Sequence, residues 1–210
     1  MYWWLEDTLY KGSLRPLSHY LVLHGAAAER GGEAIVFLGE SYAGKSTLTM
    51  KLIQNGYRLL SDEVVLIDSD SFRVVPFPRN ILIREKSIQG NADLERLCEG
   101  RWHYEDEKGE IKWMMDPGAL GAVEIAEEAR VDEIIWLERD KEASDIEPVG
   151  MRAVVEMMVQ HGLNLKKISQ VGVETIVQIV RASRNYHLRA PHAGVAWRIL
   201  RDHLGIKEKK

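Results

Sequence analysis

Cysteine is nearly absent from this chain of 210 residues, since Cys98 is the single one. One thiol cannot build an internal disulfide framework or a thiolate metal cage, which excludes small disulfide-stapled folds and zinc ribbons. A chain without disulfides suits a reducing compartment, so we expect a cytoplasmic protein. The histidines show no metal-ligand spacing, and a zinc site is not expected.

Long hydrophobic runs and an excess of one charge are also missing. No apolar stretch approaches the length of a membrane span, and the aromatic, then acidic N-terminus is unlike the basic start of a signal peptide. The 28 basic and 32 acidic side chains give a net charge of -4, which offers no broad basic surface for nucleic acid. We therefore expect neither a membrane protein nor a nucleic-acid-binding protein.

The chain does contain enough apolar residues for a core. Hydrophobic residues make up 45% of the sequence, which suits a single folded domain over residues 1–210. Strand-like apolar runs predominate over about 19–140, and the apolar spacing becomes helical over about 148–205. These patterns predict an α/β domain with a central mixed sheet and C-terminal helices.

Local patterns predict the state of most segments. Apolar runs predict strands at 20–23, 34–38, 57–60, 64–67, 72–75, 119–125, 131–137 and 186–188. Helices are predicted at 44–55, 84–98, 154–163, 168–180 and 191–204. Glycine and charge patterns predict a turn or short hairpin connection at 26–32 and a mobile loop at 100–112.

The most specific motif is a glycine-rich loop between an apolar strand and a helix. Its residues are Gly39, Glu40, Ser41, Tyr42, Ala43, Gly44, Lys45 and Ser46, with Thr47 next. This spacing is typical of a phosphate-binding P-loop, the Walker A motif, whose backbone N–H groups converge on phosphate oxygens at a helix N-terminus. Lys45 would reach the β- and γ-phosphates, and the Ser46 hydroxyl would join the Mg²⁺ shell. The sequence therefore predicts nucleotide binding.

Two acidic placements after this loop lead to different functions. Asp68 follows the run 64–67, as the metal-binding acid does in P-loop ATPases and GTPases. Asp62 and Glu63 precede the same run, where adjacent acids could divide the work between holding Mg²⁺ and taking a proton from an acceptor hydroxyl. A Ser-Asp-Glu sequence between strands is also an ordinary polar turn. Composition alone does not choose between these interpretations.

The order of the motifs resembles the HPr kinase/phosphorylase family. His24-Gly25 stands at the end of a strand before the P-loop, and Gly56-Tyr-Arg-Leu-Leu-Ser-Asp62-Glu63 follows the P-loop helix. The family has a His-Gly and a Gly-x-Arg-Leu-x-x-Asp-Asp segment in these places. The match is tight over about residues 20–68. The resemblance implies an HPr kinase-like (PEP carboxykinase-like) fold and a kinase that transfers the γ-phosphoryl group of ATP to a serine.

The resemblance also implies roles for the matched positions. Asp62 takes the place of the family's general base toward the acceptor serine, and His24 that of the histidine that supports it. Glu63 replaces the second Asp of the family. The segment from Asp116 to Gly121 is similar to a Glu-Ile-Arg-Gly-Leu-Gly segment, whose glutamate binds Mg²⁺ with the P-loop serine. We thus expect Asp62, His24 and Lys45 to be catalytic, and Ser46, Asp116 and Glu63 to bind the metal.

Two departures from the family bear on the acceptor. Gly118 stands where the family segment has arginine, and the family's N-terminal domain and a basic segment for docking the carrier protein HPr have no counterpart. The reverse, phosphorolytic activity is therefore not expected. A compact chain with these motifs is similar to the HPr kinase-like enzymes of peptide-maturation systems, some of which phosphorylate a serine of lasso-peptide precursors. We expect a serine-containing peptide or protein as the acceptor.

Two other functions remain open from the sequence. In the first, the chain is a P-loop switch or binding module, in which the nucleotide state moves the loop near 100–116 and changes a partner contact. In the second, the same fold phosphorylates a small molecule such as free serine. Relatives in the family form oligomers, so a homo-oligomer is also open. The aromatic pairs Trp3-Trp4 and Trp102, Trp113 favour packing or a subunit contact over a grip on a peptide or base.

Overall fold

A computed structural model describes residues 17–88, 92–106, 109–120 and 126–207. Trp3 and Trp4 lie outside these residues. So does most of the strand predicted at 119–125, and the residues just before it form a 3-10 helix, η1 (Pro117–Leu120). A single domain over residues 1–210 stays a prediction.

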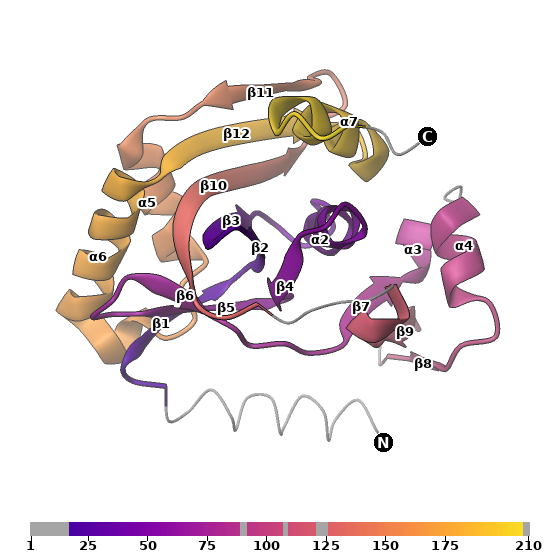
Figure 1. Ribbon diagram of the computed structural model, residues 1–210, viewed down its shortest axis with the longest axis horizontal. Coiled ribbons are helices and arrows are strands. Elements are labelled where there is room, and N and C mark those ends of the chain that lie inside the picture. The colour runs from indigo at the N-terminus through magenta and orange to yellow at the C-terminus, as the bar shows by residue number, and fades with distance from the viewer. Residues whose placement is uncertain (1–16, 89–91, 107–108, 121–125, 208–210) are drawn as a thin grey trace.

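A mixed sheet forms the centre of the protein (Figure 1). Its strands lie in the order β1-β5-β6-β10-β3-β2-β4, and β12 pairs with β10 and carries β11 on its other side. Their bounds are Tyr20–His24 (β1), Ala26–Arg30 (β2), Glu33–Leu38 (β3), Arg58–Ser61 (β4), Val64–Asp68 (β5), Arg73–Val75 (β6), Ala129–Arg139 (β10), Asp145–Pro148 (β11) and Arg184–Ala190 (β12). β10 runs parallel to β3 and β12, whereas the other pairs are antiparallel. The predicted central mixed sheet is confirmed.

Strand β3 is apolar from Ala34 to Leu38 because helices cover both faces of the sheet. Successive side chains of a strand point to opposite faces. Ala34, Val36 and Leu38 accordingly join the core on one side. Ile35 and Phe37 join the core on the other side. This two-sided burial places the end of β3, and the P-loop that follows it, between two helical layers.

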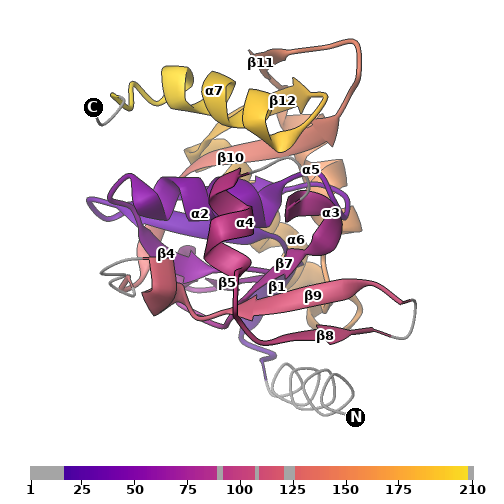
Figure 2. The same ribbon diagram turned by 90° about the vertical axis from the view of Figure 1, so that its right-hand side faces the viewer.

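Different helices cover the two faces. α5 (Met151–Gln160) and α6 (Leu165–Ala182) cover the face on the left of Figure 1. α2 (Lys45–Gln54) and α7 (Ala193–His203) cover the other face, where they contact each other. Figure 2 shows α7 lying along α2. None of the helices in the described part of the chain is long and apolar enough to cross a membrane.

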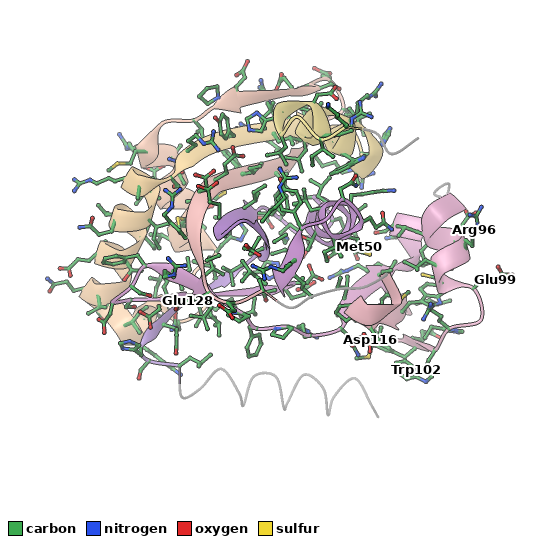
Figure 3. The ribbon with its side chains drawn as sticks, viewed as in Figure 1. Met50, Arg96, Glu99, Trp102, Asp116 and Glu128 are labelled. Atoms are coloured by element: carbon green, nitrogen blue, oxygen red, sulfur yellow. The ribbon has the colours of Figure 1, made fainter. Side chains whose placement is uncertain are left out.

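A second, small antiparallel sheet lies beside α2, on the right of Figure 1. It consists of β7 (Ile81–Arg84), β9 (Ile111–Met115) and β8 (His103–Glu105), with α3 (Glu85–Ile88) and α4 (Ala92–Cys98) packed on it. Met50 of α2 is buried against this sheet, together with Ile83 and Met115 (Figure 3). The P-loop helix is therefore held between the main sheet and the small sheet.

Two of the predicted segments were wrong. The segment 26–32 is mainly strand β2, whose residues Ala26–Ala28 are completely buried, since small side chains fit a crowded central strand without an apolar pattern. The segment 100–112 contains β8 and the first two residues of β9, Ile111 and Lys112, and is not a loop throughout. Its charged residues pair with one another, as Lys112 does with Asp106 at 2.6 Å, so charge there did not indicate a loop.

Short elements were the ones missed. β7 and β11 were not predicted, and the segment near 84–98 forms the two short helices α3 and α4. The remaining predicted strands and helices within the described ranges are confirmed within a few residues.

Candidate active site

The P-loop follows β3 and leads into α2, and its backbone requires glycine. Gly39 has φ +145°, and a Cβ atom there would lie 2.4 Å from the carbonyl oxygen of Leu137 on β10. Gly44, the N-cap of α2, has φ +108°. Tyr42 is also left-handed, with φ +68°. These conformations turn the chain tightly between strand and helix, as a phosphate-binding loop does.

Replacing Gly39 by alanine should destabilise the fold. The new methyl group combines a backbone conformation that is open essentially to glycine alone with a contact to the Leu137 carbonyl, and we expect a loss of at least about 2 kcal/mol in the free energy of unfolding. Gly31→Ala is a matched control, because its φ is +68° and nothing lies within 4 Å of the new Cβ. Urea unfolding measures both variants. Equal midpoints would contradict the close approach at Gly39.

The P-loop lines a cavity of about 970 Å³, at the upper end of the range for small-molecule sites. Its wall also includes His24, Glu63 and the start of α7. Cationic side chains on the wall are Lys45, Lys51, Arg84, Lys86 and Arg139. A concave site with such a charge attracts a polyphosphate.

Lys45 already points into the loop. Its ammonium group donates hydrogen bonds to the carbonyl oxygens of Gly39 at 2.8 Å and Glu40 at 3.1 Å. Burial lowers the pKa of Lys45, while the charges of Glu63 and Asp62 act in the opposite direction. A phosphate in the loop would therefore meet a partly desolvated cation, where the attraction is stronger than in water.

Asp62 is completely buried in the connection between β4 and β5. Within the described ranges, neither of its carboxylate oxygens has a hydrogen-bond partner. Burial and, to a smaller extent, the charge of Glu63 raise the pKa of Asp62 to about 7. The nearby Ser46 hydroxyl lowers the pKa of Asp62, but its position does not form a hydrogen bond with the carboxylate. A buried carboxyl without a partner costs stability, so its presence beside the P-loop indicates a functional group.

Glu63 and His24 face each other at the edge of the cavity. The Nδ1 atom of His24 lies 3.7 Å from a carboxylate oxygen of Glu63. Burial and the charge of Lys45 lower the pKa of His24, and Glu63 partly offsets them. The imidazole is therefore neutral near pH 7, which leaves it able to accept or share a proton. Glu63 has φ +71°, a strained conformation for a residue with a side chain and one that recurs at functional sites.

The glycine after His24 has a packing reason. β1 and β5 pair antiparallel with His24 opposite Val64, which brings the end of β1 beside the Asp62-Glu63 connection. A Cβ atom at Gly25 would lie 2.7 Å from the carbonyl oxygen of Phe37. The glycine thus lets the chain pass close to the backbone of β3, while the histidine before it lines the cavity.

His161 is a neighbour of His24 that the sequence did not indicate. The two rings stack with centroids 6.1 Å apart, and the His24 N–H donates to the His161 carbonyl at 2.8 Å. Burial lowers the pKa of His161, with smaller contributions from Lys45 and His24. The two residues are distant in the chain and no motif joins them, so no sequence signal was available.

Tyr42 connects the P-loop to the small sheet. Its hydroxyl donates to the carboxylate of Glu110 at 2.8 and 3.0 Å, and the guanidinium group of Arg84 lies 4.6 Å from the centre of its ring. Arg84 also lies 3.6 Å from Glu110. Arg84 was not predicted as a site residue because its strand, β7, was not predicted either.

The two remaining acidic candidates lie elsewhere. Asp68, at the end of β5, accepts hydrogen bonds from the N–H groups of Asp70 and Ser71, so it stabilises a turn. Asp116 follows β9 at the small sheet, where its carboxylate accepts from the Gly118 N–H at 2.7 Å (Figure 3). The η1 helix after it contacts α2, but Asp116 is not among the described residues that line the cavity. Its role as a metal ligand stays a prediction.

Comparison with known proteins supports the same family as the motifs. No family model matches the chain. The HPr kinase/phosphorylase of Caldicellulosiruptor bescii is 26% identical over 171 residues, which cover 80% of this chain and 45% of that protein. The chain thus spans about half the length of the curated relative that it matches. The HPr(Ser) kinase/phosphatase structure from Coxiella burnetii aligns with 87% of this chain and 90% of that chain, at 13% identity and a TM-score of 0.38. By its motifs and this sequence similarity, the chain is similar to the HPr kinase-like family.

Proposed function

We propose that this protein is a Mg²⁺-dependent kinase that transfers the γ-phosphoryl group of ATP to a serine hydroxyl of a peptide or protein. The observation that carries the proposal is Asp62, a buried carboxyl without a partner whose pKa is raised to about 7 next to the P-loop. A general base works best when its pKa is near the operating pH. A nucleotide switch needs no such group.

The residues of the site divide the reaction between them. Lys45 and the loop N–H groups hold the β- and γ-phosphates. Asp62 takes the proton of the acceptor serine while the serine oxygen bonds to the γ-phosphorus. The bond from that phosphorus to the β,γ-bridging oxygen breaks, and ADP is released. The negative charge of Glu63 raises the pKa of Asp62 and makes it a stronger base. Neutral His24 supports this pair through its contact with Glu63.

The residues present fit a Mg²⁺ ion that is bound with the nucleotide. Ser46 and Glu63 both line the cavity, and they supply a hydroxyl and a carboxylate oxygen, the donors that Mg²⁺ prefers. Mg²⁺ in such sites takes one or two carboxylates, substrate phosphates and several waters. Bound there, the ion would neutralise charge on the β- and γ-phosphates. Asp116 remains the third candidate ligand.

The acceptor can be identified with labelled ATP. We expect transfer from γ-labelled ATP to a serine-containing peptide, with a lasso-peptide precursor as the first candidate, and no transfer to the same peptide with serine replaced by alanine. Label on free serine alone would indicate a small-molecule kinase. Release of inorganic phosphate without a labelled acceptor would indicate a nucleotide switch, and the proposal would then be wrong.

A further inference from the structure

The cavity continues beyond the P-loop to a wall at the start of α7. This wall, called the α7 wall below, consists of Arg139, His192, Ala193, Gly194 and Trp197. None of these residues belongs to the proposed phosphoryl-transfer machinery. The loop holds only phosphates, so a cavity of about 970 Å³ leaves room for a larger group at the α7 wall.

Trp197 lies on the side of α7 that faces the P-loop helix. A Cβ atom at Gly44 would lie 3.4 Å from the Cβ atom of Ala193, so the start of α7 touches the loop at the point where α2 begins. Trp197 is one helical turn further along and shares the face of Ala193. Trp197 is half-buried, packs against the core between α2 and α7, and also lines the cavity.

The direction of a bound nucleotide follows from the loop. The Lys45 ammonium group and the carboxylates of Asp62 and Glu63 mark the end at which the γ-phosphate reacts. The α-phosphate of a P-loop ligand lies further along, toward the helix that follows the loop. The nucleoside therefore leaves the loop on the side of α2, where Thr47, Lys51 and the α7 wall line the same cavity.

The α7 wall is held in place without a ligand. The Nε atom of Arg139 donates to the carbonyl oxygen of Pro191 at 3.0 Å, and the Asp140 N–H donates to that of Ala190 at 3.1 Å. These bonds join the end of β10 to the turn that precedes α7. A Cβ atom at Gly194 would approach the Nδ1 atom of His192 to 3.2 Å, so a glycine there leaves the imidazole its position at the cavity.

We propose that the α7 wall is the nucleobase site of this protein, with the purine base of ATP stacked on Trp197 and its edge or ribose facing His192 and Arg139. An indole face is a good stacking surface for a base. The inference rests on the proposed use of a nucleoside triphosphate, and it adds that affinity depends on the base as well as on the phosphates.

The test compares ATP with inorganic tripolyphosphate, both with Mg²⁺, by calorimetric titration of the full chain. Wild-type protein should bind ATP at least 10-fold more tightly than tripolyphosphate. Trp197→Ala should weaken ATP binding by about 10- to 100-fold and leave tripolyphosphate binding within about 2-fold. Trp197→Phe should keep most of the ATP affinity. Trp102→Ala is the matched control, because this tryptophan is exposed beside the small sheet. Its replacement should change the affinity for neither ligand.

Equal wild-type affinity for ATP and tripolyphosphate would overturn the inference. This comparison needs no variant, so the inference can be tested even if Trp197→Ala fails to fold. Equal losses of both ligands in Trp197→Ala would also overturn it. The proposed kinase activity would survive either result, since it depends on the phosphates and on Asp62. A base preference in a protein that transfers no phosphate would instead contradict the proposed function and leave the base site standing.

Discussion

Asp62→Asn is expected to lower the rate of phosphoryl transfer by about 10²- to 10⁴-fold while leaving the Kd for ATP nearly unchanged. Asparagine has the shape of aspartate but cannot take the proton of the acceptor hydroxyl. The ATP contacts expected from the loop backbone and Lys45 do not involve the side chain of Asp62. Single-turnover transfer and equilibrium binding, measured on the same preparation, separate the two effects.

Asp68→Asn is the matched control for this experiment. Asp68 is the other acid near an end of β5, and its carboxylate accepts hydrogen bonds from the turn after that strand. The Asp68→Asn variant should keep a transfer rate within a few-fold of the wild-type rate. If Asp68→Asn abolished a nucleotide-dependent activity and Asp62→Asn did not, the switch interpretation would replace the kinase.

The same Asp62→Asn substitution is expected to stabilise the fold above pH 7. The pKa of Asp62 is raised from an ordinary value of 3.8 to about 7, so the folded state favours the protonated carboxyl. The contribution of the protonated Asp62 carboxyl to the free energy of unfolding is complete below pH 3.8 and is lost as the pH rises through 7. Ionised Asp62 then costs at most about 4 kcal/mol, a cost that neutral asparagine avoids.

The measurement is the free energy of unfolding of wild type and Asp62→Asn in urea at pH 5 and pH 8. The variant should be more stable at pH 8, and the difference should shrink at pH 5. A variant that is less stable than wild type at pH 8 would show that the folded state stabilises the carboxylate, contrary to its burial without a partner. Lost activity together with gained stability is the expected sign of a residue kept for function.

How far the sequence predicted the site depended on distance along the chain. The P-loop is local, so its spacing alone predicted the strand, the glycine turn and the helix. Asp62, Glu63 and His24 could be assigned only through a family resemblance, because strand pairing brings His24 opposite Val64. The structure places all three beside the loop, as the resemblance implied, whereas Asp116 remains at the small sheet.

The features that the sequence did not predict depend on contacts between residues far apart in the chain. Tyr42 and Glu110 are 68 positions apart, and their hydrogen bond depends on strands whose charged sequence predicted a loop. The completely buried alanines of β2 carry no periodic pattern, so their strand was predicted as a turn. Trp197 was not predicted as a site residue, because only the packing of α7 along α2 brings it to the cavity. Tertiary contacts decide these cases, and local patterns do not encode them.

The central claim is that Asp62, with its raised pKa, is the base that starts phosphoryl transfer. The most direct measurement is the pH dependence of kcat/KM for transfer to the acceptor peptide, in wild type and in Asp62→Asn. For wild type we predict a rate that rises about tenfold per pH unit below pH 7 and levels off above it, because only the ionised carboxyl accepts the proton. The residual rate of Asp62→Asn should lack this limb. An identical acid limb in the variant, or a wild-type rate that is flat down to pH 5, would contradict the role of Asp62.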